Sequence, residues 1–227
     1  IAAAAQAAKA LGGAPVSSTS SRPMPAALAL RLQESTRAKG ADGLRGAVPL
    51  ARAVELFEEQ ASSGIPWGFV ADGCFFRAHT VAKNLEDQGV FSEKIWAITG
   101  GGDLVIGKDK SELGFSVVVN HVAVSLHVEM KDGSKQRMVI DPSVADRLLT
   151  VDEWLGNMRS AANTGVETLF MPRFMMMLWE RDRPPKSWQP AQIEEAQQWH
   201  DAGWRESERM YQEMGYFKDP LKFMAGA

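Results

Sequence analysis

The sequence predicts an α+β fold in which a helix that begins near Cys74 packs on an antiparallel sheet. Apolar residues between Cys74 and Leu85 recur at the spacing of one helical face, and Gly89 follows as a stop. The stretch "FSVVVNHVAVSLHVEM" (residues 115–130) is rich in β-branched residues and is the strongest strand pattern in the chain. The turn "KDGS" and the stretch "KQRMVID" (135–141) then predict an antiparallel partner strand.

The other elements are predicted in chain order. Residues 1–25 have the composition of a linker or disordered leader. Residues 26–40 and 48–64 predict helices, and "EKIWAI" (93–98) predicts a strand. Residues 151–227 are helical in composition and rich in Met and Trp. We therefore expect a core domain over residues 26–150, and a helical C-terminal extension that is packed on it or appended to it.

Composition limits the classes of partner and compartment. The net charge of −3 gives no reason to expect nucleic acid or an anionic membrane as a partner. No apolar run approaches the roughly 18 residues that a membrane span needs. One cysteine cannot form an internal disulfide. The opening "IAAAAQAAKA" lacks the charged and apolar regions of a signal peptide, so no signal peptide is visible in this chain.

The only cysteine of the chain lies in "DGCFFRAH" (72–79). A thiol attacks as the thiolate, and the N-terminus of a helix stabilises negative charge. Asp72 is the expected N-cap, Gly73 leaves the approach to the sulfur open, and the Cys74 N–H is a candidate oxyanion donor. The alternative is a buried, inert cysteine, which is the commoner state of a free thiol.

A nucleophilic cysteine needs a base within hydrogen-bond reach, and the chain has four histidines. His79 is more than one helical turn from Cys74 and is expected to be structural. His127 is six residues beyond His121 on the same strand, roughly 20 Å away. His200 is expected to be a solvated histidine on a charged helix. By elimination, His121 is the predicted base, and scattered histidines with one cysteine predict no metal site.

The third member of such a site is an acid that orients the imidazole. Asp141 is the candidate, and the hairpin register decides whether it lies on the same face of the sheet as His121. A two-residue turn would put residue 141 opposite residue 124, on the face away from His121. A three-residue loop over residues 131–133, with Gly133 in the left-handed position, puts residue 141 opposite residue 123. Asp141 then shares a face with His121, and we predict this second register.

Three motifs carry a family resemblance: "DGCFFRAH", then "NHVAVSL", then "VIDPS". Together and in this order they resemble the bacterial protein-glutaminase (protein glutamine deamidase) family, over roughly residues 67 to 146. The resemblance implies a papain-like core with the catalytic triad Cys74, His121 and Asp141, and no cofactor. A single thiol sets this chain apart from the cysteine-richer secreted members.

The reaction implied is hydrolysis of the side-chain amide of Gln or Asn in a protein or peptide substrate, through a Cys thioester. Trp67 and Trp96 are candidate walls of the substrate groove, with plain core as the alternative. A papain-like peptidase, a transglutaminase-type acyltransferase and a non-catalytic binding domain remain alternative functions. The expected setting is a bacterial secreted enzyme or effector toxin, with an immunity or delivery protein as a further expected partner.

Overall fold

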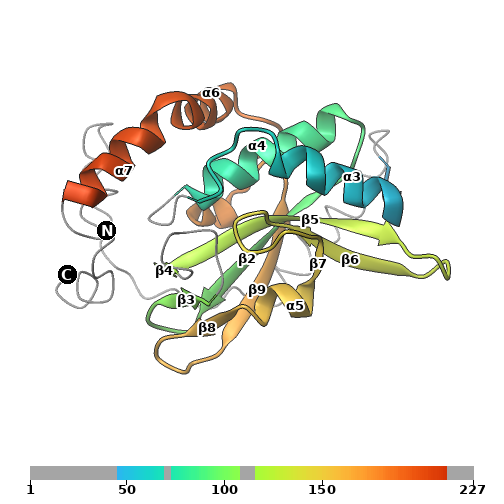
Figure 1. The fold of residues 1–227 in the computed structure, drawn as a ribbon, viewed down its shortest axis with the longest axis horizontal. Coiled ribbons are helices and arrows are strands. Elements are labelled where there is room, and N and C mark those ends of the chain that lie inside the picture. The colour runs from blue at the N-terminus through green and yellow to red at the C-terminus, as the bar shows by residue number, and fades with distance from the viewer. Residues whose placement is uncertain (1–44, 69–72, 108–115, 214–227) are drawn as a thin grey trace.

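The computed structural model describes residues 45–68, 73–107 and 116–213 of the chain (Figure 1). Its centre is a six-stranded sheet in the order β7-β6-β5-β2-β9, with β1 beside β5. Neighbours along this order are antiparallel, whereas β1 runs parallel to β5. The strands are β1 (Val48–Pro49), β2 (Glu93–Thr99), β5 (Asn120–Glu129), β6 (Lys135–Ile140), β7 (Leu149–Thr150) and β9 (Val166–Pro172).

A second, three-stranded sheet continues from the end of the first. It has the order β4-β3-β8 and consists of β3 (Leu104–Ile106), β4 (Ser116–Val118) and β8 (Met158–Ser160). The single strand predicted over residues 115–130 is therefore two strands, β4 and β5, which belong to different sheets. The chain bends at Val119, whose side chain is 59% exposed, and the residue pattern does not mark this bend because β-branched residues continue through it.

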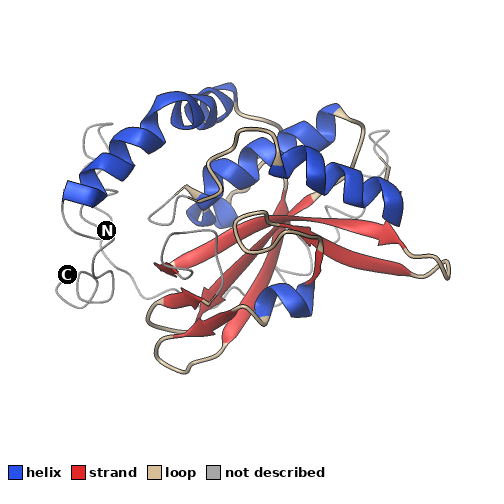
Figure 2. Ribbon diagram, viewed as in Figure 1, coloured by secondary structure: helices blue, strands red, loops and turns tan. Residues whose placement is uncertain are grey.

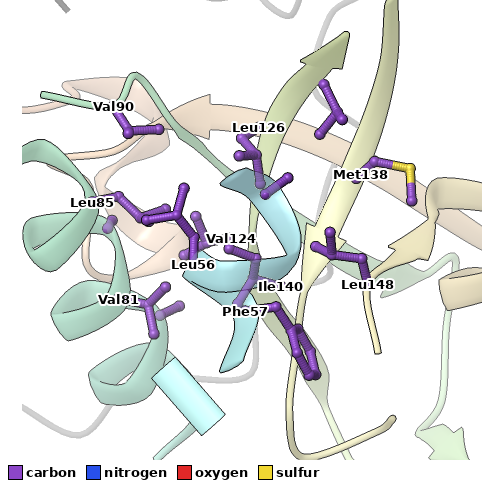
Figure 3. Close-up of a cluster of buried hydrophobic side chains, with 14 of the residues drawn as sticks. Leu56, Phe57, Val81, Leu85, Val90, Val124, Leu126, Met138, Ile140 and Leu148 are labelled. Atoms are coloured by element: carbon purple, nitrogen blue, oxygen red, sulfur yellow. The ribbon is translucent and has the colours of Figure 1, made fainter. Parts of the chain in front are cut away.

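Helices α3 (Leu50–Ala61) and α4 (Cys74–Asp87) cover one face of the main sheet (Figures 1 and 2). Successive strand residues point to opposite faces, and the even-numbered residues of β5 face these helices. Figure 3 shows the resulting core, in which Leu56 of α3 and Leu85 of α4 meet Val124 of β5. Burial of these apolar side chains is the main source of stability for this layer.

The opposite face of the sheet has its own core, which closes on α5 (Val151–Leu155). Trp154 of α5 is fully buried there with Ala123, Val139 and Ile95. A capping box between Thr150 and Glu153 starts this short helix, so the position of Trp154 is fixed directly after β7.

The C-terminal part of the chain returns over α4. It comprises the 3-10 helix η2 (Leu178–Asp182), α6 (Pro190–Gln198), the π-helix η3 (Trp199–Gly203) and α7 (Trp204–Glu213). Figure 1 shows α6 and α7 on the helical side of the sheet. Trp199 is buried against α4, where its ring stacks on Phe76 with centroids 5.3 Å apart.

The predicted boundary at residue 150 is wrong in one respect. Residues 151–172 contain strands β8 and β9, and β9 pairs with β2 along its whole length. The helical segment therefore begins after the sheet is complete. Composition misled here because Trp and Met of this stretch fill the two cores rather than a helical surface. The predicted leader (1–25) and the helix over 26–40 lie outside the described residues.

The other predicted elements are confirmed. The pattern over 48–64 forms α3, the pattern from Cys74 forms α4, residues 93–98 lie in β2, and all but the last residue of 135–141 form β6. Within the described ranges, no helix combines the length and apolar character that a bilayer crossing requires.

Candidate active site

Cys74 is the first residue of helix α4, as the sequence predicts. The N-cap, however, is Gly73 rather than Asp72, which lies outside the described residues; Gly73 has a left-handed φ of +84°. An ideal Cβ on Gly73 would lie 2.1 Å from the ring of Trp199, so the position excludes a side chain for a second reason. The first turn of α4 therefore has no side-chain cap and no acidic residue, which leaves its N–H groups to act on a negative charge.

His121 and Asp141 meet through the predicted hairpin register. Strand β5 pairs Val124 with Ile140, so residue 141 lies opposite residue 123. Gly133 has φ +80° in the connecting loop, which is the left-handed position that the three-residue loop requires. His121 Nε2 lies 2.8 Å from Asp141 Oδ2. The structure therefore confirms the register and brings these two side chains together.

The Cys74 sulfur forms a hydrogen bond with the His121 imidazole. Asp141 binds Nε2, which leaves Nδ1 as the ring nitrogen that faces the sulfur. Cys74 is half-buried, whereas His121 and Asp141 are 3% and 4% exposed. The sulfur is therefore the atom of this group that a substrate can approach.

Burial and charge act in opposite directions on the imidazole. Burial disfavours the imidazolium, but the charge and hydrogen bond of Asp141, together with Cys74, raise the pKa of His121 to about 9. Burial also acts to raise the pKa of Asp141, yet the charge and hydrogen bond of His121 hold this pKa below its usual range. At neutral pH the two residues form an ion pair, and an imidazolium beside the sulfur favours the thiolate.

Two further side chains hold Asp141, and sequence reasoning did not assign them to the site. Trp154 Nε1 donates to Asp141 Oδ2 over 2.8 Å, and its ring stacks on His121 with centroids 5.8 Å apart. Ser143 donates to Oδ1 from both its backbone N–H and its hydroxyl. The Asp-Pro-Ser order was a usable indication for Ser143, because hydrogen bonds from an Asp side chain to the residue two positions on are common. No local pattern pointed to Trp154.

The other histidines lie away from the sulfur. His79 is buried, as expected for a structural residue, and its Nδ1 lies 2.9 Å from Lys94 Nζ. His127 contacts Arg137 on the neighbouring strand. The expectation of a solvated His200 is wrong: its Nε2 lies 2.7 Å from Thr80 Oγ1, and burial lowers the pKa of His200 to about 4. The packing of η3 on α4, which no local pattern shows, buries this ring.

The two predicted groove tryptophans have different positions. Trp96 is 1% exposed in the core between sheet and helices, which contradicts a role as a groove wall and supports the alternative of plain core. Trp67 is half-buried, and its indole N–H donates to the carbonyl of Gln60 in α3 over 3.1 Å. No group of three or more His, Cys, Asp or Glu side chains in the described part of the chain could hold a metal ion.

Residues 51–158 match a protein family described as glutaminase. The matched segment contains Cys74, His121 and Asp141 and ends inside β8, so it includes all three residues that meet at the sulfur. The family resemblance read from the motifs is thereby confirmed. A comparison with the sequences of curated proteins gave no match.

Solved structures of protein-glutaminase share the fold. A mutant of pro-protein-glutaminase is 18% identical with a TM-score of 0.55, over 70% of this chain and 61% of its own. A crystal structure of protein-glutaminase is 17% identical with a TM-score of 0.54, over 69% and 90% of the two chains. The NMR structure of protein-glutaminase from Chryseobacterium proteolyticum is 19% identical with a TM-score of 0.53, over 67% and 86%. The chain spans 51% and 61% of the length of two pro-protein-glutaminase chains.

Proposed function

We propose that this protein is a protein glutamine deamidase, which hydrolyses the side-chain amide of glutamine in a protein substrate through Cys74. One observation carries the proposal: the Cys74 sulfur and Asp141 are both hydrogen-bond partners of His121, within a segment that matches the glutaminase family. The cysteine begins a helix, the histidine lies on β5, and the acid directly follows the neighbouring strand β6, which supports a papain-like mechanism.

In the first half of the reaction, the Cys74 thiolate attacks the carbon of the side-chain amide. The carbonyl oxygen becomes an oxyanion, and the N–H of Cys74 in the first turn of α4 is the donor that we assign to it. The His121 imidazolium gives its proton to the departing nitrogen. The carbon–nitrogen bond breaks, ammonia leaves, and the substrate acyl group remains on the sulfur as a thioester.

In the second half of the reaction, water hydrolyses the thioester. The now neutral His121 takes a proton from the water, and the resulting hydroxide attacks the thioester carbon. The carbon–sulfur bond breaks, which releases glutamate and restores the thiolate beside the imidazolium. Asp141 keeps the imidazole in one orientation through both halves, and Trp154 and Ser143 keep Asp141 itself in place.

The test is mass spectrometry of a glutamine-rich protein incubated with the enzyme. We expect a mass gain of about one dalton per converted glutamine with one ammonia released, as amide hydrolysis through an acyl enzyme requires. The Cys74→Ala and His121→Ala variants should lose this activity. His127→Ala is the matched control, because it removes the same side chain from the same strand at about 20 Å from His121, and it should retain activity.

Other reaction products would indicate a different activity for the same site. Cleavage of the substrate backbone without ammonia would make the protein a peptidase. Incorporation of an added primary amine in place of hydrolysis would make it an acyltransferase. An unmodified substrate together with a Cys74 that does not react with iodoacetamide at neutral pH would leave only a binding role.

A further inference from the structure

The start of helix α4 is weakly specified by its own residues. Gly73, the N-cap, has no side chain that could accept a hydrogen bond from the first N–H groups, and the first turn has no acidic residue. Glycine also has more backbone freedom than any other residue, so Gly73 does not by itself fix its left-handed φ of +84°. The position of Cys74, the next residue, therefore depends on contacts from other parts of the chain.

Trp199 of η3 makes such a contact. An ideal Cβ on Gly73 would lie 2.1, 2.3 and 2.8 Å from Cζ2, Cη2 and Cε2 of Trp199, so the six-membered part of the indole lies against the Gly73 Cα. The same indole stacks on Phe76, with centroids 5.3 Å apart and ring planes 25° from parallel. One ring therefore contacts both the residue directly before Cys74 and the residue two positions after it.

His200 extends the contact between η3 and α4. Its Nε2 lies 2.7 Å from Thr80 Oγ1. Thr80 is four residues beyond Phe76 and so lies on the same face of the helix. The rings of Trp199 and His200 also meet edge to face, with centroids 5.4 Å apart. The π-helix is thus held on α4 by an apolar contact at the first turn and by a hydrogen bond one turn later.

The first turn of α4 contains two groups of the proposed mechanism. The Cys74 sulfur forms the hydrogen bond with His121, and the Cys74 N–H is the donor that we assign to the oxyanion. A rotation about the backbone of Gly73 would reorient both groups relative to His121. Displacement of reacting groups by about 1 Å can lower a rate on the order of a hundredfold. A contact that restricts Gly73 is therefore a contact that can affect the reaction.

We propose that Trp199 is a positioning residue for the reaction: its indole, in contact with Gly73 and Phe76, holds the first turn of α4 so that the Cys74 sulfur stays beside His121. Trp199 is 8% exposed and acts through these two residues rather than on the substrate. It lies outside residues 51–158, the segment that matches the glutaminase family. Its effect on catalysis rests on the proposed function, whereas its effect on the sulfur does not.

The test measures alkylation of Cys74 by iodoacetamide across pH in the full chain and in Trp199→Ala. The chain has one cysteine, so the rate reports on one sulfur. A displaced first turn weakens the hydrogen bond to His121 and the effect of the helix N-terminus, and both favour the thiolate. We expect the midpoint of the pH profile to move upward by about 0.5 to 1 pH unit in Trp199→Ala. A midpoint equal to that of the unchanged protein would overturn the proposal.

Trp188→Ala is the matched control for Trp199→Ala. It removes the same side chain from the same C-terminal part of the chain, and Trp188 also packs on α4, where its ring centroid lies 5.0 Å from that of His79. His79 is more than one helical turn beyond Cys74. We expect both variants to unfold at a lower temperature than the unchanged protein, and only Trp199→Ala to have a displaced alkylation midpoint. Equal displacements in the two variants would show a general loosening of the helices and would overturn the proposal.

Trp199→Phe takes the place of Trp199→Ala if the latter does not fold. The phenyl ring can still stack on Phe76, but it is smaller than the indole and reaches less far toward Gly73. We expect the alkylation midpoint to move upward in this variant as well, by a smaller amount. In that case, a Trp199→Phe midpoint that equals that of the unchanged protein would overturn the proposal.

Kinetics with a glutamine peptide distinguish positioning from substrate binding. We expect Trp199→Ala to lower kcat by about tenfold or more and to leave KM unchanged, because Trp199 acts on the reacting groups. A raised KM with unchanged kcat would indicate a role in substrate binding and would overturn the proposal. If the unchanged protein releases no ammonia from any glutamine substrate, the proposed function is refuted, and the alkylation profiles still decide the role of Trp199.

Discussion

Asp141 determines the protonation state of the site. It accepts hydrogen bonds from His121, Trp154 and Ser143 while almost fully buried. A carboxylate that is held by this many donors favours its charged form, and the charge in turn favours the imidazolium of His121. The ion pair therefore depends on all the hydrogen bonds that stabilise the Asp141 carboxylate, and not on His121 alone.

The raised pKa of His121 predicts how stability depends on pH. The folded-state pKa of about 9 exceeds the unfolded value of about 6.5, so the contribution is fully present below pH 6.5 and is lost as pH rises through 9. We expect the free energy of unfolding to fall between these two pH values by on the order of 2 to 3 kcal/mol from this group. Urea denaturation at a series of pH values measures the fall.

The control for this prediction is His121→Gln, which keeps a side chain that can hydrogen-bond to Asp141 and removes the titrating ring. Its free energy of unfolding should decline less over the same interval. Equal declines in the two proteins would show that another group causes the loss, and would contradict the ion pair described for His121 and Asp141.

At the level of single residues, the sequence was sufficient where local turn chemistry decides geometry. Gly133 fixes the hairpin loop, the loop fixes the register, and the register brings Asp141 to His121. Trp154 could not be found in the same way. Its role depends on contacts with Asp141 and His121 that form only in the folded chain, and its position has no local pattern that differs from an ordinary helix.

The N-terminus of α4 is the element on which the proposed nucleophile depends. Gly73 serves two requirements there, a left-handed backbone and space for the ring of Trp199. Trp199 comes from a π-helix, a rare element that is often found at functional sites. The C-terminal segment therefore helps to fix the position of the first turn of α4.

A comparison of Gly73 with Gly133 separates the requirement for a left-handed backbone from the requirement for space, because the two glycines have nearly the same φ. Gly133 has φ +80° with nothing near its position, whereas Gly73 has φ +84° and the Trp199 ring in contact. We expect Gly133→Ala to cost about 1 kcal/mol of stability from the left-handed backbone. Gly73→Ala should cost about 3 kcal/mol or more, because the Trp199 ring must also move.

Chemical denaturation of both variants gives the comparison, and Gly73→Ala combined with Trp199→Ala tests the cause. If the ring contact causes the excess, the cost of Gly73→Ala is smaller in the Trp199→Ala background. Equal costs for the two glycines would contradict the close packing of Trp199 against the first turn.

At the level of elements, local residue patterns predicted α3, α4, β2 and β6. It failed where one continuous pattern serves two sheets. β4 and β5 form one apolar run, yet they pair with β3 and β2 in separate sheets. Pairing partners are distant in sequence, so the division at Val119 is a tertiary property.

The whole molecule consists of a sheet closed by β9 and a helical segment laid over α4. This arrangement predicts different outcomes for two truncations. A chain that ends after Thr150 lacks β9, the edge partner of β2, and should not unfold cooperatively. A chain that ends after Gln189 keeps both sheets and should unfold cooperatively, with stability lower by about 2 to 4 kcal/mol because the burial of Trp199 is lost.

Circular dichroism during thermal unfolding distinguishes the two truncated chains. A cooperative transition in the chain that ends after Thr150 would place the core boundary at residue 150, contrary to the sheet order found for β9. That boundary was predicted from composition, which does not record that apolar side chains of residues 151–172 complete the cores on both faces.

The central claim is that the Cys74 sulfur, activated by His121 and Asp141, forms a thioester with the side-chain acyl group of glutamine. The most direct measurement is the intact mass of the enzyme, quenched in acid during turnover of a glutamine peptide. The account predicts an adduct equal to the peptide less one ammonia, located on the peptide fragment that contains Cys74 and missing in Cys74→Ala. Ammonia release at full rate by Cys74→Ala would contradict it.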